Sequence, residues 1–235
     1  MEISSTNDYA KRLTRRGEKE GALVIADHQR QGRGRQRRKW YSQPGKGLCI
    51  SIILRPVLAT EKLGLISLLA GVVIAQTVEK LSQLNPTLKW PNDVMLQSRK
   101  LSGILIESDF KGGRLTSIVV GIGININHDE SDFHSTIRSK STSLYLVSKK
   151  ITSRVDFMVA FLNQFEEIYH HIEKENYEYI ISEWLRRCPK FKKPIRIQIE
   201  DRTISGVFHN IDGNGWLILK QKNAQPITVK TGEVC

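Results

Sequence analysis

Short apolar or alternating stretches dominate the first half of the chain, and such stretches are typical of β-strands. They cover residues 22–26, 48–54, 88–95, 101–107 and 118–126. Between them, residues 63–84 carry apolar positions at helical spacing. A short helix is expected over 8–16, because the side-chain oxygens before it suit a helix N-terminus. This order predicts a set of strands, of which 22–26 is a buried one, with a helix laid across it.

The second half begins with helical patterns and ends with short strands. The predicted core stripe of its first helix consists of Val155, Met158, Leu162, Phe165, Ile168 and Ile172. A further helix is expected over 177–185. Strands are then expected at 195–199, 203–211, 216–219 and 227–229, separated by turn-forming polar residues. The change of pattern predicts two domains, 1–189 and 190–235, the second a small appended barrel.

Composition narrows the class of protein. With 235 residues, 40% of them hydrophobic, the chain can bury a sizeable core. No stretch approaches the uninterrupted apolar length that crosses a bilayer, and residues 1–7 lack the features of a secretory signal. A cytoplasmic protein without a membrane partner is therefore expected. Cys49, Cys188 and Cys235 are odd in number and widely spaced, which predicts free thiols, and the scattered histidines predict no metal centre.

The formal net charge of +12 predicts a positive field that attracts nucleotides, nucleic acids or an acidic protein. Candidate chemistry is concentrated first in the basic segment from Gly32 to Trp40, GRGRQRRKW. Its glycines let backbone amides approach an anion, and its arginines supply paired donors for a carboxylate or phosphate. A solvated loop or an RNA-binding patch would have the same glycine- and arginine-rich sequence. Trp40 favours a nucleotide site slightly, because its ring offers a base a stacking face.

Two further segments carry candidate groups. The run from Lys89 to Asp93, followed by the run from Lys100 to Glu107, would place a lysine, an amide and a carboxylate at the ends of adjacent strands. Taken singly, these residues also suit a turn, a strand edge and a solvated carboxylate. The third segment, 121–127, has glycines that permit close approach of a ligand or another backbone. It lacks the third glycine of a dinucleotide-binding fingerprint and does not open a helix.

Taken together, five motifs in this order resemble those of biotin protein ligases. They are Ser5-Thr6-Asn7, Gly32-Arg33-Gly34-Arg35 to Trp40, Lys89-Trp90-Pro91-Asn92-Asp93, Lys100-x-x-Gly103 and Gly121-x-Gly123-Ile124-Asn125. The resemblance covers nearly the whole chain. It implies an α/β (α+β) fold with a mixed sheet and packed helices, as in class II synthetase-like ligases, followed by an SH3-like β-barrel.

The same resemblance implies an ATP-dependent ligase. Such an enzyme uses Mg²⁺ to form biotinyl-AMP from biotin and ATP. It then transfers biotin to a specific lysine on the biotin carboxyl carrier domain of a biotin-dependent carboxylase, making an amide bond.

The resemblance also implies roles for individual residues. The biotin site would comprise Ser5, Thr6, Asn7, Gln29, Gly32, Arg33, Gly34, Arg35, Lys100 and Gly103. The ATP site would comprise Arg38, Trp40, Lys89, Asn92, Asp93 and Asn125, with Trp40 stacking on adenine. Lys100 and Arg35 are the candidate catalytic groups, because a carboxylate that attacks a phosphate needs cations aimed at the transition state.

The chain departs from the family pattern in two places. Only residues 1–4 precede Ser5, where most members have a strand and often a helix-turn-helix domain, so neither repressor function nor specific DNA binding is expected. The apparent lack of that strand leaves the sheet edge and a homodimer open. Arg37 stands where many members have a small residue, often glycine, which predicts a less flexible loop.

Two alternative functions stay open at this point. A lipoate-type ligase would share the fold and the acyl-adenylate chemistry, but its usual arginine pair and triple glycine are absent. A nucleic-acid-binding module built on the arginines of 30–39 would require steeply salt-dependent binding and no dependence on biotin.

Overall fold

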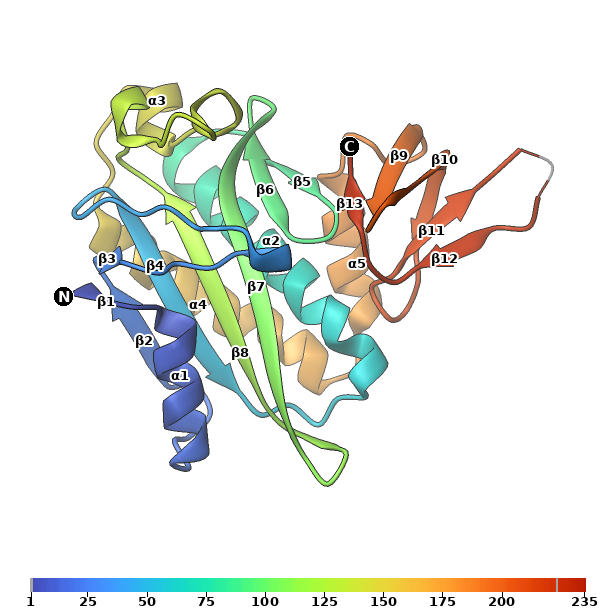
Figure 1. Cartoon of the computed structure of the whole chain (residues 1–235), viewed down its shortest axis with the longest axis horizontal. Coiled ribbons are helices and arrows are strands. Elements are labelled where there is room, and N and C mark those ends of the chain that lie inside the picture. Colours follow the sequence, from blue (N-terminus) through green and yellow to red (C-terminus); the bar gives the residue numbers. More distant parts are fainter. Residues whose placement is uncertain (1, 223) are drawn as a thin grey trace.

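The computed structural model describes residues 2–222 and 224–235, so Met1, where the first predicted domain begins, lies outside it. The main sheet comprises β2 (Leu23–Ala26), β4 (Gly47–Leu54), β5 (Thr87–Lys89), β6 (Asp93–Leu96), β7 (Arg99–Lys111) and β8 (Arg114–Asn125). Its strands lie in the order β2-β4-β8-β7-β6-β5, and every neighbouring pair is antiparallel. The long β7–β8 hairpin runs through the middle of the molecule (Figure 1).

Helices cover both faces of this sheet. Alternate residues of a strand point to opposite faces, and β8 shows this directly. Val120 and Ile122 belong to the large core beneath α2 (Leu63–Ser82) and α4 (Arg154–Glu173), whereas Val119 belongs to a small core beneath α1 (Thr6–Arg15). Figure 1 shows α1 and the helix pair α2 and α4 on opposite sides of the sheet. The α1 side therefore has uncovered sheet surface on which a site can form.

Helix α2 is the core helix of the fold. Its residues from Leu65 to Ala75 are all buried. Together with the turn before it, the segment Thr60–Ser82 has the length and composition to cross a membrane, so the expectation that no stretch approaches that length was too strong. Burial inside the protein covers 72% of its most apolar window, which gives this hydrophobicity a structural explanation.

The C-terminal part forms a second, five-stranded sheet in the order β12-β11-β10-β9-β13. Its strands are β9 (Pro194–Ile199), β10 (Arg202–Ile211), β11 (Leu217–Lys220), β12 (Ile227–Val229) and β13 (Glu233–Val234). This sheet is compatible with the predicted SH3-like domain. Phe208 of β10 packs against Trp184 of α5 (Tyr177–Arg186), so the apolar interior of the small sheet joins the main core.

Several expectations about single elements were wrong. The predicted strand 88–95 is two strands, β5 and β6, joined by a turn at Pro91, which has no N–H to donate to a ladder. On α4 the predicted Phe165, Ile168 and Ile172 are buried, but Phe157 and Phe161 complete the buried row, and Val155 is 63% exposed. Strand β2 is an edge strand buried on one face, with Leu23 and Ile25 exposed on the other.

A strand does precede Ser5, contrary to the expectation that it is missing. β1 (Glu2–Ile3) pairs in parallel with β3 (His28–Gln29), in a register that places Ile3 opposite Gln29. This parallel pair is separate from the antiparallel main sheet. It brings the start of α1 next to Gln29, two segments that the sequence analysis assigned to one site.

Candidate functional site

A cavity of about 280 Å³ opens on the α1 side of the main sheet. Its walls come from the start of α1, the basic loop 32–40, strands β6, β7 and β8, the segment 133–141 and strand β13. The structure brings these predicted site residues together around it: Ser5, Thr6, Asn7, Gln29, Arg33, Gly34, Arg35, Arg38, Trp40, Lys89, Asn92, Asp93, Lys100, Gly103 and Asn125. Gly32 does not line the cavity; a Cβ there would lie 2.5 Å from the carbonyl oxygen of Trp40, so this glycine shapes the loop.

One end of the cavity is lined mainly by neutral polar groups, and the charge of Arg33 beside them is paired with carboxylates of the protein. Ser5 caps α1 and accepts a hydrogen bond from the backbone N–H of Asp8 at 3.4 Å. The backbone N–H and the hydroxyl of Thr6 both donate to Oε1 of Gln29, at 2.7 and 3.0 Å. All three cavity residues, Ser5, Thr6 and Gln29, are buried. Small neutral donors and acceptors with fixed positions suit a neutral polar ligand group.

The other end is charged. Lys100 Nζ lies 2.5 Å from Asp93 Oδ1, because β6 and β7 are neighbouring strands in which Lys100 pairs with Met95, two residues from Asp93. The structure thus brings Lys100, Asn92 and Asp93 together, as the sequence suggested, whereas Glu107 from the same pair of runs lies in the interior of β7 and does not line the cavity. Asn92 donates to the carbonyl of Ile104 at 2.9 Å and accepts from Arg35 Nη1 at 3.1 Å.

Arg35 is the arginine of the basic loop that faces neutral acceptors. Besides Asn92 it donates to the carbonyl of Gly232 at 3.5 Å, and burial lowers the pKa of its guanidinium below the ordinary arginine value. Arg33 instead pairs with Asp8 and Glu107 at 2.5 and 2.9 Å. The two arginines of the Gly-Arg-Gly-Arg motif therefore differ: carboxylates of the protein already balance Arg33, whereas Arg35 can offer its charge to an anion.

The indole of Trp40 packs directly over two glycines, Gly103 and Gly123, which are called the glycine seat below. Gly103 of β7 and Gly123 of β8 are directly opposite each other in the sheet. A Cβ on Gly123 would lie 2.2 Å from Cε2 of Trp40, and one on Gly103 would lie 3.3 Å from Cζ3. The Gly121 Cα likewise faces Asn7, whose Oδ1 would be 2.1 Å from a Cβ. Glycines at these positions were expected to admit a ligand or another backbone, but in the structure they make room for the side chains of Trp40 and Asn7.

The basic loop folds back on itself. Trp40 donates its backbone N–H to Gly32 at 2.9 Å, and Gly34 donates to Arg38 at 2.7 Å. At the tip, Arg37 has a φ of 59°, in the left-handed region that costs residues with a Cβ free energy. This conformation explains why a glycine would suit position 37, as the family comparison of the sequence suggested.

Sequence reasoning missed cavity residues that come from distant segments. Glu233 of β13 forms ion pairs with Arg38 and with Lys89, the latter at 3.9 Å. The hydrogen bond to Arg38 lowers the pKa of Glu233 and raises that of Arg38. Ser141, which also lines the cavity, follows a segment without a recognised motif. Its backbone forms an isolated parallel β-bridge with that of Lys100. No local signal links these residues to the motifs, because only the tertiary fold brings them together.

Cysteine chemistry plays no part in this cavity as described. Cys49 and Cys188 are buried, and burial raises the pKa of each thiol to about 11, which keeps it protonated. All three cysteines are free, as predicted. Within residues 2–222 and 224–235, no group of three or more histidine, cysteine, aspartate or glutamate side chains is arranged to hold a metal ion.

Comparisons with known proteins agree on one family. A model described as "Biotin/lipoate A/B protein ligase family" matches residues 2–125. The chain is 34% identical over 222 residues to the "Bifunctional ligase/repressor BirA" of Bacillus spizizenii, covering 93% of this chain and 67% of that protein. It is 29% identical to the "Biotin--[acetyl-CoA-carboxylase] ligase" of Paracoccus denitrificans, covering 92% and 90%.

A solved structure shares the whole fold. The biotin protein ligase from Aquifex aeolicus in complex with biotin and ATP superposes with a TM-score of 0.85 at 26% identity, covering 100% of this chain and 95% of that one.

Proposed function

The chain belongs to the biotin/lipoate A/B protein ligase family, and on that premise we propose that it is an ATP-dependent biotin protein ligase. Both relatives described above carry ligase names, one of them that of a biotin ligase, and a similar biotin protein ligase structure holds biotin and ATP. The observation that carries the proposal is a single cavity that joins a neutral polar end to an end with Lys100 and Arg35. Biotin has the same polarity, with a neutral ureido ring at one end and a carboxylate at the other.

In this proposal the ureido ring lies among Ser5, Thr6, Asn7 and Gln29, whose fixed donors and acceptors match its N–H and C=O groups. The carboxylate points to Arg35 and Lys100. Gly34 and Gly103 line the cavity beside the ligand chain, and Gly103 makes room for the Lys100 side chain, whose Nζ would lie 3.2 Å from a Cβ there. Gly32, predicted as a biotin-site residue, acts on the loop that surrounds the ligand.

ATP lies beside biotin. The indole of Trp40 stacks on adenine, and Asn125 contributes a hydrogen bond near it. Arg38, Lys89 and Asn92 orient the phosphates. Asp93 and Asn92 suit magnesium, because carboxylate and amide oxygens are its preferred protein ligands and one carboxylate with substrate phosphates is a common arrangement. When bound, the ion neutralises phosphate charge.

The chemistry has two steps, and this chain mainly positions and stabilises the reactants. A carboxylate oxygen of biotin attacks the α-phosphorus of ATP, the bond to the bridging oxygen breaks, and pyrophosphate leaves. Lys100 and Arg35 offset the negative charge that gathers as the two anions meet. In the second step the lysine amine of the acceptor attacks the carbonyl carbon of the mixed anhydride. The bond to AMP breaks and the amine gives up a proton.

The acceptor in this proposal is a biotin carboxyl carrier domain of a biotin-dependent carboxylase. The main sheet and helices, residues 1–189, would form the catalytic domain, and residues 190–235 the SH3-like domain. The small domain would take part in the site through Gly232 and Glu233, which line the cavity.

A pyrophosphate-exchange assay tests the proposal. Purified protein should exchange labelled pyrophosphate into ATP when biotin and Mg²⁺ are both present, because adenylation is reversible before the acceptor arrives. Omission of either should stop exchange. Exchange with lipoate in place of biotin would assign the protein to the lipoate branch of the family. Salt-sensitive binding to nucleic acid without any exchange would overturn the ligase function.

A further inference from the structure

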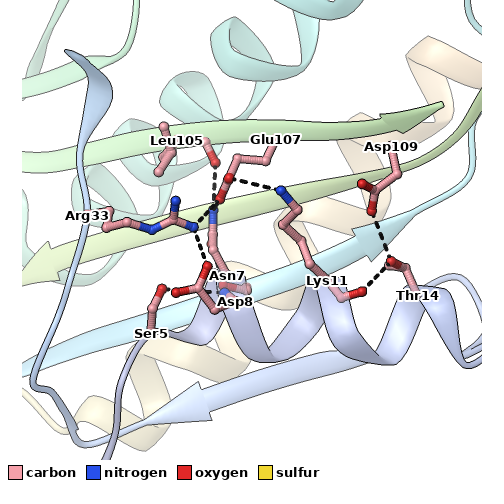
Figure 2. A network of polar contacts seen from close by, with 10 residues as sticks. Ser5, Asn7, Asp8, Lys11, Thr14, Arg33, Leu105, Glu107 and Asp109 are labelled. Atoms are coloured by element: carbon pink, nitrogen blue, oxygen red, sulfur yellow. Dashed lines mark hydrogen bonds and ion pairs between the residues drawn. The ribbon is translucent and has the colours of Figure 1, made fainter. Parts of the chain in front are cut away.

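The polar network beneath the neutral end of the cavity centres on Glu107 of β7 (Figure 2). Its carboxylate accepts hydrogen bonds from Asn7 Nδ2 and Arg33 Nη2, both at 2.9 Å, and from Lys11 Nζ at 3.3 Å. Asn7 and Arg33 line the cavity, but Glu107 and Lys11 do not. Glu107 therefore connects two walls of the site, the start of α1 and the basic loop, from behind.

Asn7 is held on every side. Its Oδ1 accepts from the hydroxyl of Ser51 at 2.6 Å, and its Nδ2 donates to Glu107 and, at 3.4 Å, to the carbonyl of Leu105. The bare Cα of Gly121 leaves the room that this side chain occupies. With its two ends fixed, the amide has one orientation relative to the cavity, and Glu107 supplies the charged contact that selects it.

The charges of the network balance. Arg33 and Lys11 supply two positive charges, and Asp8 and Glu107 supply two negative ones. Burial raises the pKa of Glu107, but the hydrogen bond from Asn7 and the nearby charges of Arg33 and Lys11 outweigh it, and the net pKa is lowered. The carboxylate is thus ionised at neutral pH. Because it pairs with the guanidinium of Arg33, that guanidinium is not free to bind an anionic ligand.

We propose that Glu107 is a positioning residue for biotin: by orienting Asn7 and anchoring Arg33 it holds the basic loop closed over the neutral end of the ligand. The proposal rests on the biotin ligase function proposed above. Glu107 acts through other side chains, so it should govern binding of biotin more than the rate of the chemical step, which takes place at the Lys100 end.

Glu107→Gln tests the proposal, because the amide keeps the size of the side chain but cannot accept from both Asn7 and Arg33 without also presenting an N–H to a cation. Asp109→Asn is the matched control. Asp109 lies on the same strand and also reaches α1, through Thr14 Oγ1 at 3.2 Å, but contacts neither Asn7 nor Arg33. Both variants remove one negative charge from β7.

Two readouts separate positioning from general destabilisation. In the exchange assay, Glu107→Gln should raise KM for biotin roughly tenfold and change kcat less than about threefold, as expected for the loss of one charge-assisted hydrogen bond. In limited trypsin digestion without ligand, the arginines of loop 32–40 should be cleaved several times faster. Asp109→Asn should match the parent in both measurements.

The inference is overturned if Glu107→Gln matches the parent in both measurements, or if Asp109→Asn has the same defects. Arg33→Ala and the double variant with Glu107→Gln give a further check: the two should be cleaved by trypsin equally fast if Glu107 acts on the loop through Arg33. Should Glu107→Gln fail to fold, Asp8→Asn weakens the same anchor at a more exposed position, and it should also speed cleavage of the loop. Because digestion needs no ligand, a parent without biotin-dependent exchange would refute the proposed function and leave the loop test intact.

Discussion

Replacing Gly123 by alanine adds one methyl group beneath Trp40, and the structure indicates that the ring must then move. The new Cβ would lie 2.2 to 2.6 Å from three atoms of the indole, far inside van der Waals contact. The strand cannot yield easily, because β8 lies between β4 and β7 and pairs with both along its length. Trp40 belongs to a surface loop and is the group that is displaced.

The cost follows from this geometry. Inserting a methyl group into a packed site typically costs about 1–3 kcal/mol. Because the loop can swing away from β8, we expect this cost to appear as a smaller population of the seated indole and only slightly as a loss of global stability. If Trp40 stacks on adenine, a cost of about 1.4 kcal/mol raises KM for ATP about tenfold.

Pyrophosphate exchange measured against ATP and against biotin tests this expectation. KM for ATP should rise more than KM for biotin, and the thermal midpoint should fall by only a few degrees. Gly213→Ala is the control, since a Cβ there meets nothing within 4 Å. An unchanged KM for ATP in Gly123→Ala, with Trp40 fluorescence also unchanged, would refute the assigned role of the glycine seat.

Other substitutions test the charged groups. Lys100→Ala should lower the exchange rate about a hundredfold, on the order of 3 kcal/mol of transition-state stabilisation; normal exchange would reduce Lys100 to a partner of Asp93. Arg35→Gly should release the adenylate early and therefore biotinylate serum albumin faster than the parent at equal adenylation; equal labelling would contradict a retention role. Burial lowers the pKa of His128 to about 4 from the ordinary 6.5, so the unfolded chain binds an extra proton between these values. The free energy of unfolding should thus fall by up to about 3 kcal/mol as pH drops from 6.5 to about 4. The dependence of this free energy on pH should be weaker in His128→Phe, as chemical denaturation at each pH will reveal.

Local signals made much of the site predictable. The side-chain oxygens of residues 4–7 indicated a helix start, but several good caps stand in a row there, so the expected start at residue 8 was two residues late: Ser5 caps α1, which begins at Thr6. The glycines of β7 and β8 indicate close packing, although the sequence does not predict that the side chains of Trp40 and Asn7 are the groups that pack there. Motifs near each other on adjacent strands, such as Asp93 and Lys100, meet through simple hairpin geometry.

Packing between distant segments decides the features that the sequence could not predict. On α4, two rows of apolar residues have helical spacing, one through Val155 and one through Phe157, and only packing against α2 decides which row is buried. Nothing in the sequence pairs Glu233 with Arg38, because the two residues are 195 positions apart. Glu107 was recognised as part of a motif, but its role depends on the α1 contacts that the fold creates.

The cavity wall joins residues from the first helix to the last strand, and this has a consequence for biosynthesis. A ribosome makes Ser5 more than 200 residues before Glu233, as the two positions in the sequence show, so the nascent chain can assemble the main sheet long before β13 exists to pair with β9. Contacts of such large sequence separation form late in folding, because ordering the intervening chain must precede them. Competence to bind ligand should therefore appear abruptly, once residues up to Glu233 have left the ribosome, and ribosome-bound chains stalled before Gly232 should be folded in large part yet catalytically silent.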